Sequence, residues 1–131
     1  LQKILKHLIK KYSIKKENIL GHSDIAPNRK KDPGEKFPWY QLAKKKLCLW
    51  HNLNQNKIKI YRKEKLNLHE EKVFFQNLYN IGYSKIETIS YNKNKTSLIK
   101  AFQRRFRQNL VDGRADKECY LISQNLIYFK S

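Results

Sequence analysis

Proline and glycine are concentrated in one stretch of the chain, and this stretch limits which regular elements can form. All three prolines and two of the four glycines of the 131 residues lie between Gly21 and Pro38. Proline fixes φ and lacks a backbone N–H, and glycine favours turns, so a segment dense in both forms a shaped loop. The sequence therefore predicts regular elements before and after this loop, which is itself free to carry polar side chains.

The segments on either side of the loop have helical and extended patterns. Over residues 1–12 apolar side chains recur at intervals of three and four, as in an amphipathic helix. Ile19 and Leu20 then predict a short buried strand that ends at Gly21. Pro38 suits the first turn of another helix, whose apolar face runs from Trp39 to Trp50. These elements favour a mixed α/β arrangement in the N-terminal part.

The remainder of the chain divides into a polar stretch and a helical unit. Residues 51–68 are rich in Asn and Lys and lose the helical period, apart from an alternation through Ile58 and Ile60 that predicts one edge strand. Three helical patterns follow, at 73–78, at 96–106 with Thr96 as the expected N-cap, and at 116–126. We therefore expect a linker over residues 51–68 and a small all-α, three-helix domain over residues 69–131.

The charge of the chain is strongly positive. Its 29 Lys and Arg against 11 Asp and Glu give a formal charge of +18, with 40% hydrophobic residues beside them. This hydrophobic content argues against a disordered basic tail, and no run approaches the roughly 18 apolar residues of a membrane span. Nucleic acid is one polyanionic partner that the charge would fit, although the basic residues are spread along the chain without a recognised motif. Cys48 and Cys119 match no metal or redox spacing and are expected to be free thiols.

His22 and Asp32 lie ten residues apart on the Gly/Pro-rich loop. An imidazole and a carboxylate can supply two ligands of a zinc site, but for the pair alone an Asx turn beside a partly buried histidine is the favoured interpretation. The whole string, GHSDIAPNRKKDPGEKFPW, is more specific. It resembles the second half of the active site in zinc-dependent N-acetylmuramoyl-L-alanine amidases of type 2, the superfamily that also contains the peptidoglycan recognition proteins.

The resemblance implies a role for each matching residue. His22 and Asp32 would be ligands of Zn²⁺, and Lys30 would stabilise the oxyanion that forms when water attacks the amide. Asp24 would have a structural role, either by capping the loop or by accepting a hydrogen bond that orients His22. Arg29 belongs to a solvated basic rim and is a candidate for contact with substrate carboxylates. Trp39 is a candidate for substrate binding, although a place in the core is the favoured interpretation for it.

Residues 69–130 resemble the small peptidoglycan-binding domain that some of these amidases carry. The matching motif is a helix with the pair Phe102–Gln103, then a basic turn, then Asp112–Gly113 and a last helix. The residues expected to face the cell wall are Gln103, Arg104, Arg105 and Arg107. The implied partners are peptidoglycan and muropeptides.

The resemblance is incomplete at the start of the domain. Such amidases take another His ligand and a catalytic Glu from strands that precede the first helix here, and the chain, which contains no Met, begins inside that helix. We therefore expect residues 1–50 to be the C-terminal portion of an α/β (α+β) amidase domain, a mixed sheet with flanking helices, that holds half of the active site. The expected protein is a peptidoglycan hydrolase of the bacterial envelope, periplasmic or secreted. The alternative is a non-catalytic basic module that binds cell wall or nucleic acid.

Overall fold

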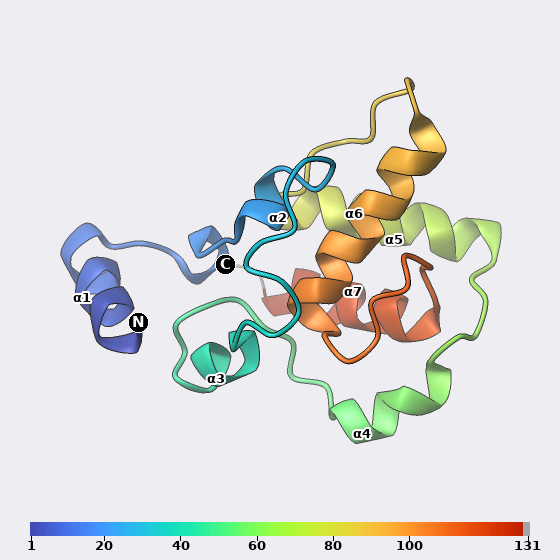
Figure 1. The fold of residues 1–131 in the computed structure, drawn as a ribbon. Helices are drawn as coiled ribbons and strands as arrows, with labels where there is room; N and C mark the ends of the chain where they lie inside the picture. Colours follow the sequence, from blue (N-terminus) through green and yellow to red (C-terminus); the bar gives the residue numbers. More distant parts are fainter. Residues whose placement is uncertain (130–131) are drawn as a thin grey trace.

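The computed structural model describes residues 1–129, and over this range every regular element is a helix (Figure 1). The α-helices are α1 (Gln2–Tyr12), α2 (His22–Ile25), α3 (Trp39–Lys44), α4 (Gln55–Ile58), α5 (Leu68–Ile81), α6 (Tyr91–Phe106) and α7 (Lys117–Phe129). Two 3-10 turns, η1 (Lys16–Asn18) and η2 (Lys59–Tyr61), lie between them. No helix in this range is both long and apolar enough to cross a bilayer.

The expected mixed sheet is wrong for the described residues. Ile19 and the residue before α2, Gly21, do have extended backbone, but neither pairs with a second extended segment within residues 1–129. The bridge between Lys65 and Asp116 is isolated, and no strand forms within residues 1–129. A strand is stable only when its N–H and C=O groups pair with a neighbour, so an apolar run alone does not make one.

The edge strand expected at Ile58 and Ile60 is also wrong, because these residues lie in α4 and η2. The cause is a local cap. Asn54 Oδ1 accepts hydrogen bonds from the N–H groups of Asn56 and Lys57 at 3.0 and 3.2 Å, which starts a helical turn. The alternating pattern of two isoleucines is too short to compete with this capping interaction.

The three helices predicted for the C-terminal part are confirmed as α5, α6 and α7. Asn67 caps α5 by accepting from Glu70 N at 2.8 Å, and Asp116 Oδ1 accepts from Cys119 N at 3.0 Å at the start of α7. The N-cap predicted at Thr96 is wrong, since α6 begins at Tyr91 and Thr96 Oγ1 donates back to Asn92 O. Figure 1 shows α5, α6 and α7 gathered into one body.

Two apolar clusters hold the chain together. The larger is built mainly from α5, α6 and α7 and also takes in Leu49 and Ile58; the smaller contains Trp39, Leu42, Leu47 and Cys48. Trp50 packs against both. Both cysteines are buried and unbridged, which confirms the prediction of free thiols. The division of the chain into two domains joined by a linker over residues 51–68 stays a prediction.

Helix α1 lies at one end of the molecule (Figure 1) and is only partly covered. The predicted helix is confirmed, but only Leu5 and Ile9 of its apolar stripe pack against the smaller cluster. Leu1 and Ile4 remain 61% and 63% exposed. The amphipathic pattern therefore identified the helix correctly without showing what covers it.

Candidate functional site

The Gly/Pro-rich loop brings His22 and Asp32 together. His22 is the first residue of α2, and the N–H of Ser23 donates to the carbonyl of Asp32 at 2.9 Å, which closes the loop on itself. As a result His22 Nδ1 lies 2.5 Å from Asp32 Oδ2. Both side chains are open to solvent, with 69% and 59% of their surfaces exposed. An imidazole nitrogen and a carboxylate oxygen thus contact each other directly at the solvent-accessible surface.

Gly21 allows this closure because it has no side chain. A Cβ on Gly21 would lie 2.5 Å from Pro33 Cδ and 3.3 Å from Trp39 Cζ2. The pyrrolidine ring cannot move aside as a flexible side chain would, so only glycine fits here. The close approach of Gly21 and Pro33 holds the two ends of the loop beside each other, and their neighbours in sequence are His22 and Asp32.

Lys30 lies on the same loop as the His22–Asp32 pair. The hydrogen bond with His22 is the main cause that lowers the pKa of Asp32 below its usual value, and the positive charge of Lys30 contributes to the same shift. Lys30 is exposed, as are its neighbours Arg29 and Lys31. Within residues 1–129 no group of three His, Cys, Asp or Glu side chains gathers as a metal site would require.

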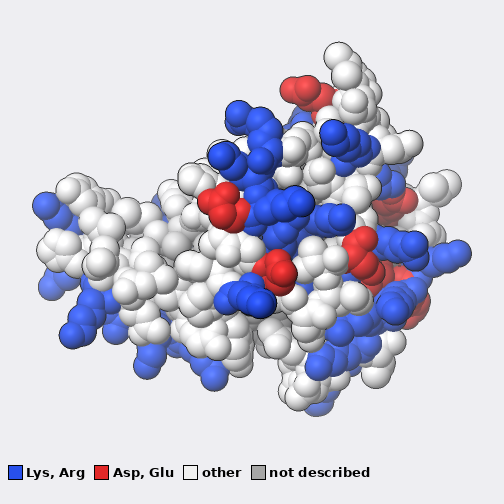
Figure 2. All heavy atoms as spheres, in the orientation of Figure 1, with Lys and Arg blue, Asp and Glu red and all other residues white. Residues whose placement is uncertain are grey.

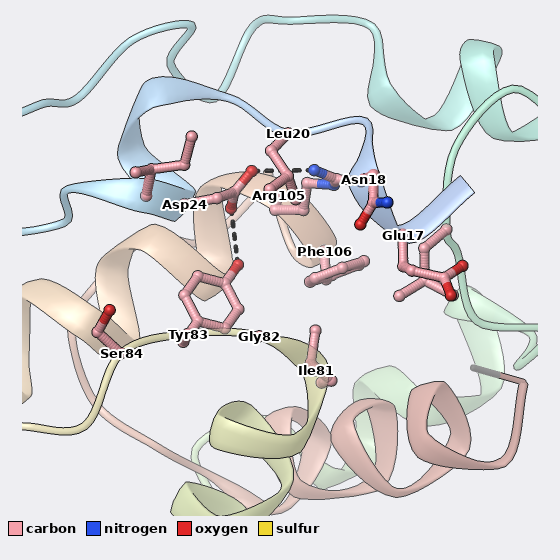
Figure 3. A pocket seen from close by; sticks show the side chains of 12 residues that line it. Glu17, Asn18, Leu20, Asp24, Ile81, Gly82, Tyr83, Ser84, Arg105 and Phe106 are labelled. Carbon is pink, nitrogen blue, oxygen red and sulfur yellow. Dashed lines mark hydrogen bonds and ion pairs between the residues drawn. The ribbon is translucent and has the colours of Figure 1, made fainter. Parts of the chain in front are cut away.

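Asp24 is buried beneath the loop and joins it to the C-terminal helices (Figure 3). Its Oδ1 accepts from Tyr83 Oη at 2.7 Å, and its Oδ2 accepts from Arg105 Nη1 and from Gly21 N, both at 2.9 Å. Burial is the first cause that raises the pKa of Tyr83 well above its ordinary value, and the Asp24 carboxylate adds to it. The network lines a hollow of about 320 Å³ that also includes Phe106.

The hydrogen bonds of Asp24 therefore hold the start of α2 in place against the C-terminal part of the chain. The Asp24 side chain accepts the N–H of Gly21, the residue that precedes His22, while Arg105 of α6 and Tyr83 after α5 fix the carboxylate. Charge-assisted hydrogen bonds in a buried setting are strong and directional. The sequence did not single out Tyr83, and it assigned Arg105 to the cell-wall face instead of to Asp24. Both residues lie far from Asp24 along the chain, by 59 and 81 residues, and no local pattern links such distant positions.

The residues expected to face the cell wall are buried. Gln103 is 0% exposed, and it donates from Nε2 to Asp112 Oδ1 and accepts from Gly113 N, each at 2.9 Å. Arg107 is buried against Asp116 and Asp112. The expectation that these polar side chains point outward is wrong, because acidic and amide groups within the fold satisfy them.

Arg104, Arg105 and Trp39 are buried too, with 7%, 3% and 3% of their surfaces exposed. The guanidinium of Arg105 stacks over the Trp39 ring at 3.8 Å, which assigns Trp39 to the core. Arg104 differs from Arg105 and Arg107 because the described part of the chain gives it no carboxylate partner; its Nη1 is buried without a hydrogen bond, as is Arg105 Nε.

His51 is a buried histidine that lies outside the loop. Both of its ring nitrogens are buried without a hydrogen-bond partner among residues 1–129, and the ring stacks on Trp50 with centroids 5.2 Å apart. Burial lowers the pKa of His51 to about 4. The imidazole is therefore neutral at pH 7, as a packed core residue.

No protein-family model matches the chain. The N-acetylmuramoyl-L-alanine amidase AmiD of Escherichia coli is 32% identical over 124 residues, which are 95% of the chain and 45% of AmiD. The 1,6-anhydro-N-acetylmuramyl-L-alanine amidase AmpD of Enterobacter cloacae is 59% identical over 32 residues, which are 24% of the chain and 17% of AmpD.

Solved structures give the same result. E. coli AmiD in complex with anhydro-N-acetylmuramic acid-L-Ala-D-γ-Glu-L-Lys superposes with a TM-score of 0.81 at 32% identity, over 97% of the chain and 49% of AmiD. AmpDh3 of Pseudomonas aeruginosa, in complex with anhydromuramic pentapeptide, gives 0.75 at 29% identity, over 95% of the chain and 49% of AmpDh3. The chain spans about half the length of these relatives. The similarity in sequence and in fold shows that the chain is homologous to the matching half of an AmpD/AmiD-like N-acetylmuramoyl-L-alanine amidase.

Proposed function

We propose that the chain is part of a zinc-dependent peptidoglycan hydrolase of the bacterial envelope, which cleaves the amide between N-acetylmuramic acid and L-alanine. One observation carries the proposal. Along a chain that is similar to AmiD over 95% of its length, the loop with the amidase signature holds His22 Nδ1 and Asp32 Oδ2 2.5 Å apart and open to solvent. Muropeptides are the substrates proposed for the complete enzyme.

The residues of the loop fit zinc in kind. Imidazole nitrogen and carboxylate oxygen are ligands that Zn²⁺ takes in catalytic sites, which use three protein ligands and keep one position open. His22 and Asp32 would provide two of the three. The resemblance implies that a further His and a catalytic Glu are supplied by a segment that precedes α1, and the described residues offer no third ligand in their place.

The loop residues would divide the chemistry among them. Bound zinc would polarise the amide carbonyl and lower the pKa of a water molecule. His22 and Asp32 would hold the metal, and the Gly21–Pro33 contact would fix the distance between them. Lys30 would place its ammonium group where negative charge develops on the carbonyl oxygen, so that it stabilises the transition state more than the bound substrate. Asp24 would keep α2, and with it His22, in position.

A chimeric enzyme tests this proposal. Residues 1–131 would be joined to the N-terminal part of E. coli AmiD that the chain does not span, and the release of L-Ala-D-γ-Glu-L-Lys from the anhydro-muropeptide would be measured by chromatography. We expect zinc-dependent hydrolysis that is abolished by His22→Ala and by Asp32→Ala. Lys30→Ala should lower kcat by about 10²-fold or more, as loss of an oxyanion contact does.

Lys72→Ala is the matched control, because Lys72 is an exposed lysine on α5 away from the loop. This variant should retain the full rate. A folded chimera that binds zinc without hydrolysing the substrate would contradict the proposal. An increase in KM alone for Lys30→Ala would show that Lys30 binds substrate and transition state equally, which contradicts a role in stabilising the oxyanion.

A further inference from the structure

A basic pocket lies between the loop after α2 and helix α6. Its volume is about 420 Å³, and none of the described residues that line it is acidic. Figure 2 shows a cluster of blue side chains in the middle of the molecular face, where Figure 1 places this loop against α6. The loop and the helix contribute three cations each: Arg29, Lys30 and Lys31, and Lys93, Lys100 and Arg104.

Arg104 is a cation of this pocket for which the described residues supply no carboxylate partner. Its Nη1 is buried without a hydrogen-bond partner in the described structure. Arg105 Nε is unpartnered in the same way, but Arg105 and Arg107 each form an ion pair with a buried aspartate, Asp24 and Asp116 respectively. A buried donor of a charged group that stays unpaired is costly, so such groups are normally satisfied. Within this run of three arginines on and after α6, the one that lines the basic pocket is the one without a carboxylate.

The turn that follows α6 supports Lys100. Gly113 lies so close to this side chain that a Cβ on Gly113 would be 3.0 Å from Lys100 Cε and 3.3 Å from Lys100 Cγ. Gln103 holds the turn, since Gly113 N donates to Gln103 Oε1 and Gln103 Nε2 donates to Asp112 Oδ1, each at 2.9 Å. The Gln103 and Asp112–Gly113 motif thus forms a fixed wall against which the stem of Lys100 lies.

We propose that this pocket binds the free carboxylates of a peptidoglycan stem peptide, with Lys100 and Arg104 as binding residues. The proposal rests on the proposed function, because Lys30, the residue proposed to stabilise the oxyanion, also lines this pocket. A D-glutamate joined through its γ-carboxyl keeps its α-carboxylate free, and this anion lies one residue beyond the L-alanine of the cleaved bond. Arginine and lysine that converge on one hollow are suited to such an anion.

Calorimetric titration of residues 1–131 with the tripeptide L-Ala-D-γ-Glu-L-Lys tests the proposal without catalysis. We expect binding that weakens about tenfold in Lys100→Gln and in Arg104→Gln, the change expected when one charge-assisted contact is lost. Lys100→Gln covers the case in which the buried Arg104 variant fails to fold. Lys72→Gln, which removes the same charge from α5, should bind as the unchanged chain does.

Three further titrants identify the anion. The tripeptide with both carboxylates converted to amides should bind at least about tenfold more weakly than the free acid. Inorganic phosphate and duplex DNA should not bind more tightly than the tripeptide at the same salt concentration. Equal binding of the amidated tripeptide, no effect of Lys100→Gln, or tighter binding of phosphate or DNA would each overturn the proposal. Failure of the chimeric enzyme would leave these titrations unaffected, so the two proposals fail separately.

Discussion

Asp24 and Arg105 should be strongly coupled in the free energy of unfolding. Asp24→Ala would leave the guanidinium of Arg105, which is 3% exposed, without its carboxylate, and would also leave Tyr83 Oη and Gly21 N without their acceptor. Breaking a buried ion pair by removing one partner costs about 3–5 kcal/mol. That is a large share of the roughly 5–15 kcal/mol that stabilises an ordinary domain.

A double-mutant cycle measures the coupling. Urea unfolding at pH 7, followed by far-UV circular dichroism, would give the free energies of Asp24→Ala, Arg105→Met and the double variant. The double variant should be more stable than the sum of the two losses predicts, with a coupling of about 2–3 kcal/mol, because it leaves no unpaired buried charge. Tyr83→Phe, which removes one hydrogen bond to the carboxylate, should cost about 1.5–3 kcal/mol and is the variant to use if Asp24→Ala does not fold.

Asp32→Ala is the control for this cycle. Asp32 also forms an ion pair, with His22, but both side chains are exposed, and exposed pairs contribute little to stability. Its unfolding curve should match that of the unchanged chain. A coupling between Asp24 and Arg105 below about 0.5 kcal/mol would refute the reasoning, since neighbours that interact directly exceed this value.

Gly21→Ala should lower the free energy of unfolding by about 1–3 kcal/mol in the same urea assay, because the added methyl group meets Pro33. His51 has a pKa of about 4 when folded and 6.5 in its reference state, so its stabilising contribution is complete above pH 6.5 and is lost as the pH falls from 6.5 toward 4. His51→Phe should therefore reduce the loss of stability between pH 7 and pH 4 by up to about 3 kcal/mol. Arg104→Met should leave the unfolding free energy unchanged or raise it, because Arg104 Nη1 has no hydrogen-bond partner to lose among residues 1–129. A fall in the unfolding free energy like that of Arg105→Met would contradict this.

The sequence was sufficient to predict features that depend on near neighbours along the chain. The helical spacing over residues 1–12 and in the C-terminal part identified α1, α5, α6 and α7, and the concentration of proline and glycine identified the loop. The pairing of His22 with Asp32 followed from a contiguous motif. These signals are local, and the chain needs no distant partner to express them.

Features that depend on distant partners were not predictable. Ile19 and Leu20 have the composition of a strand, but a strand also requires a second strand beside it, which the described residues do not supply. In the sequence, Arg105 and Arg107 have the character of surface residues. In the structure they are buried, and they form ion pairs with Asp24 and Asp116. The prediction that these charged side chains near the end of α6 are exposed was therefore wrong, because their acidic partners come from other parts of the chain.

The placement of the two tryptophans makes the intrinsic fluorescence of this chain a selective reporter. The Trp39 ring stacks against Arg105, and the Trp50 ring stacks on His51. The ring centroids of Trp50 and Phe106 are 5.6 Å apart, so both indoles contact residues at the C-terminal end of α6. Helices α5, α6 and α7 contain no tryptophan of their own. Emission would therefore shift to longer wavelength when the N-terminal segment detaches from α6, even while the three helices remain folded.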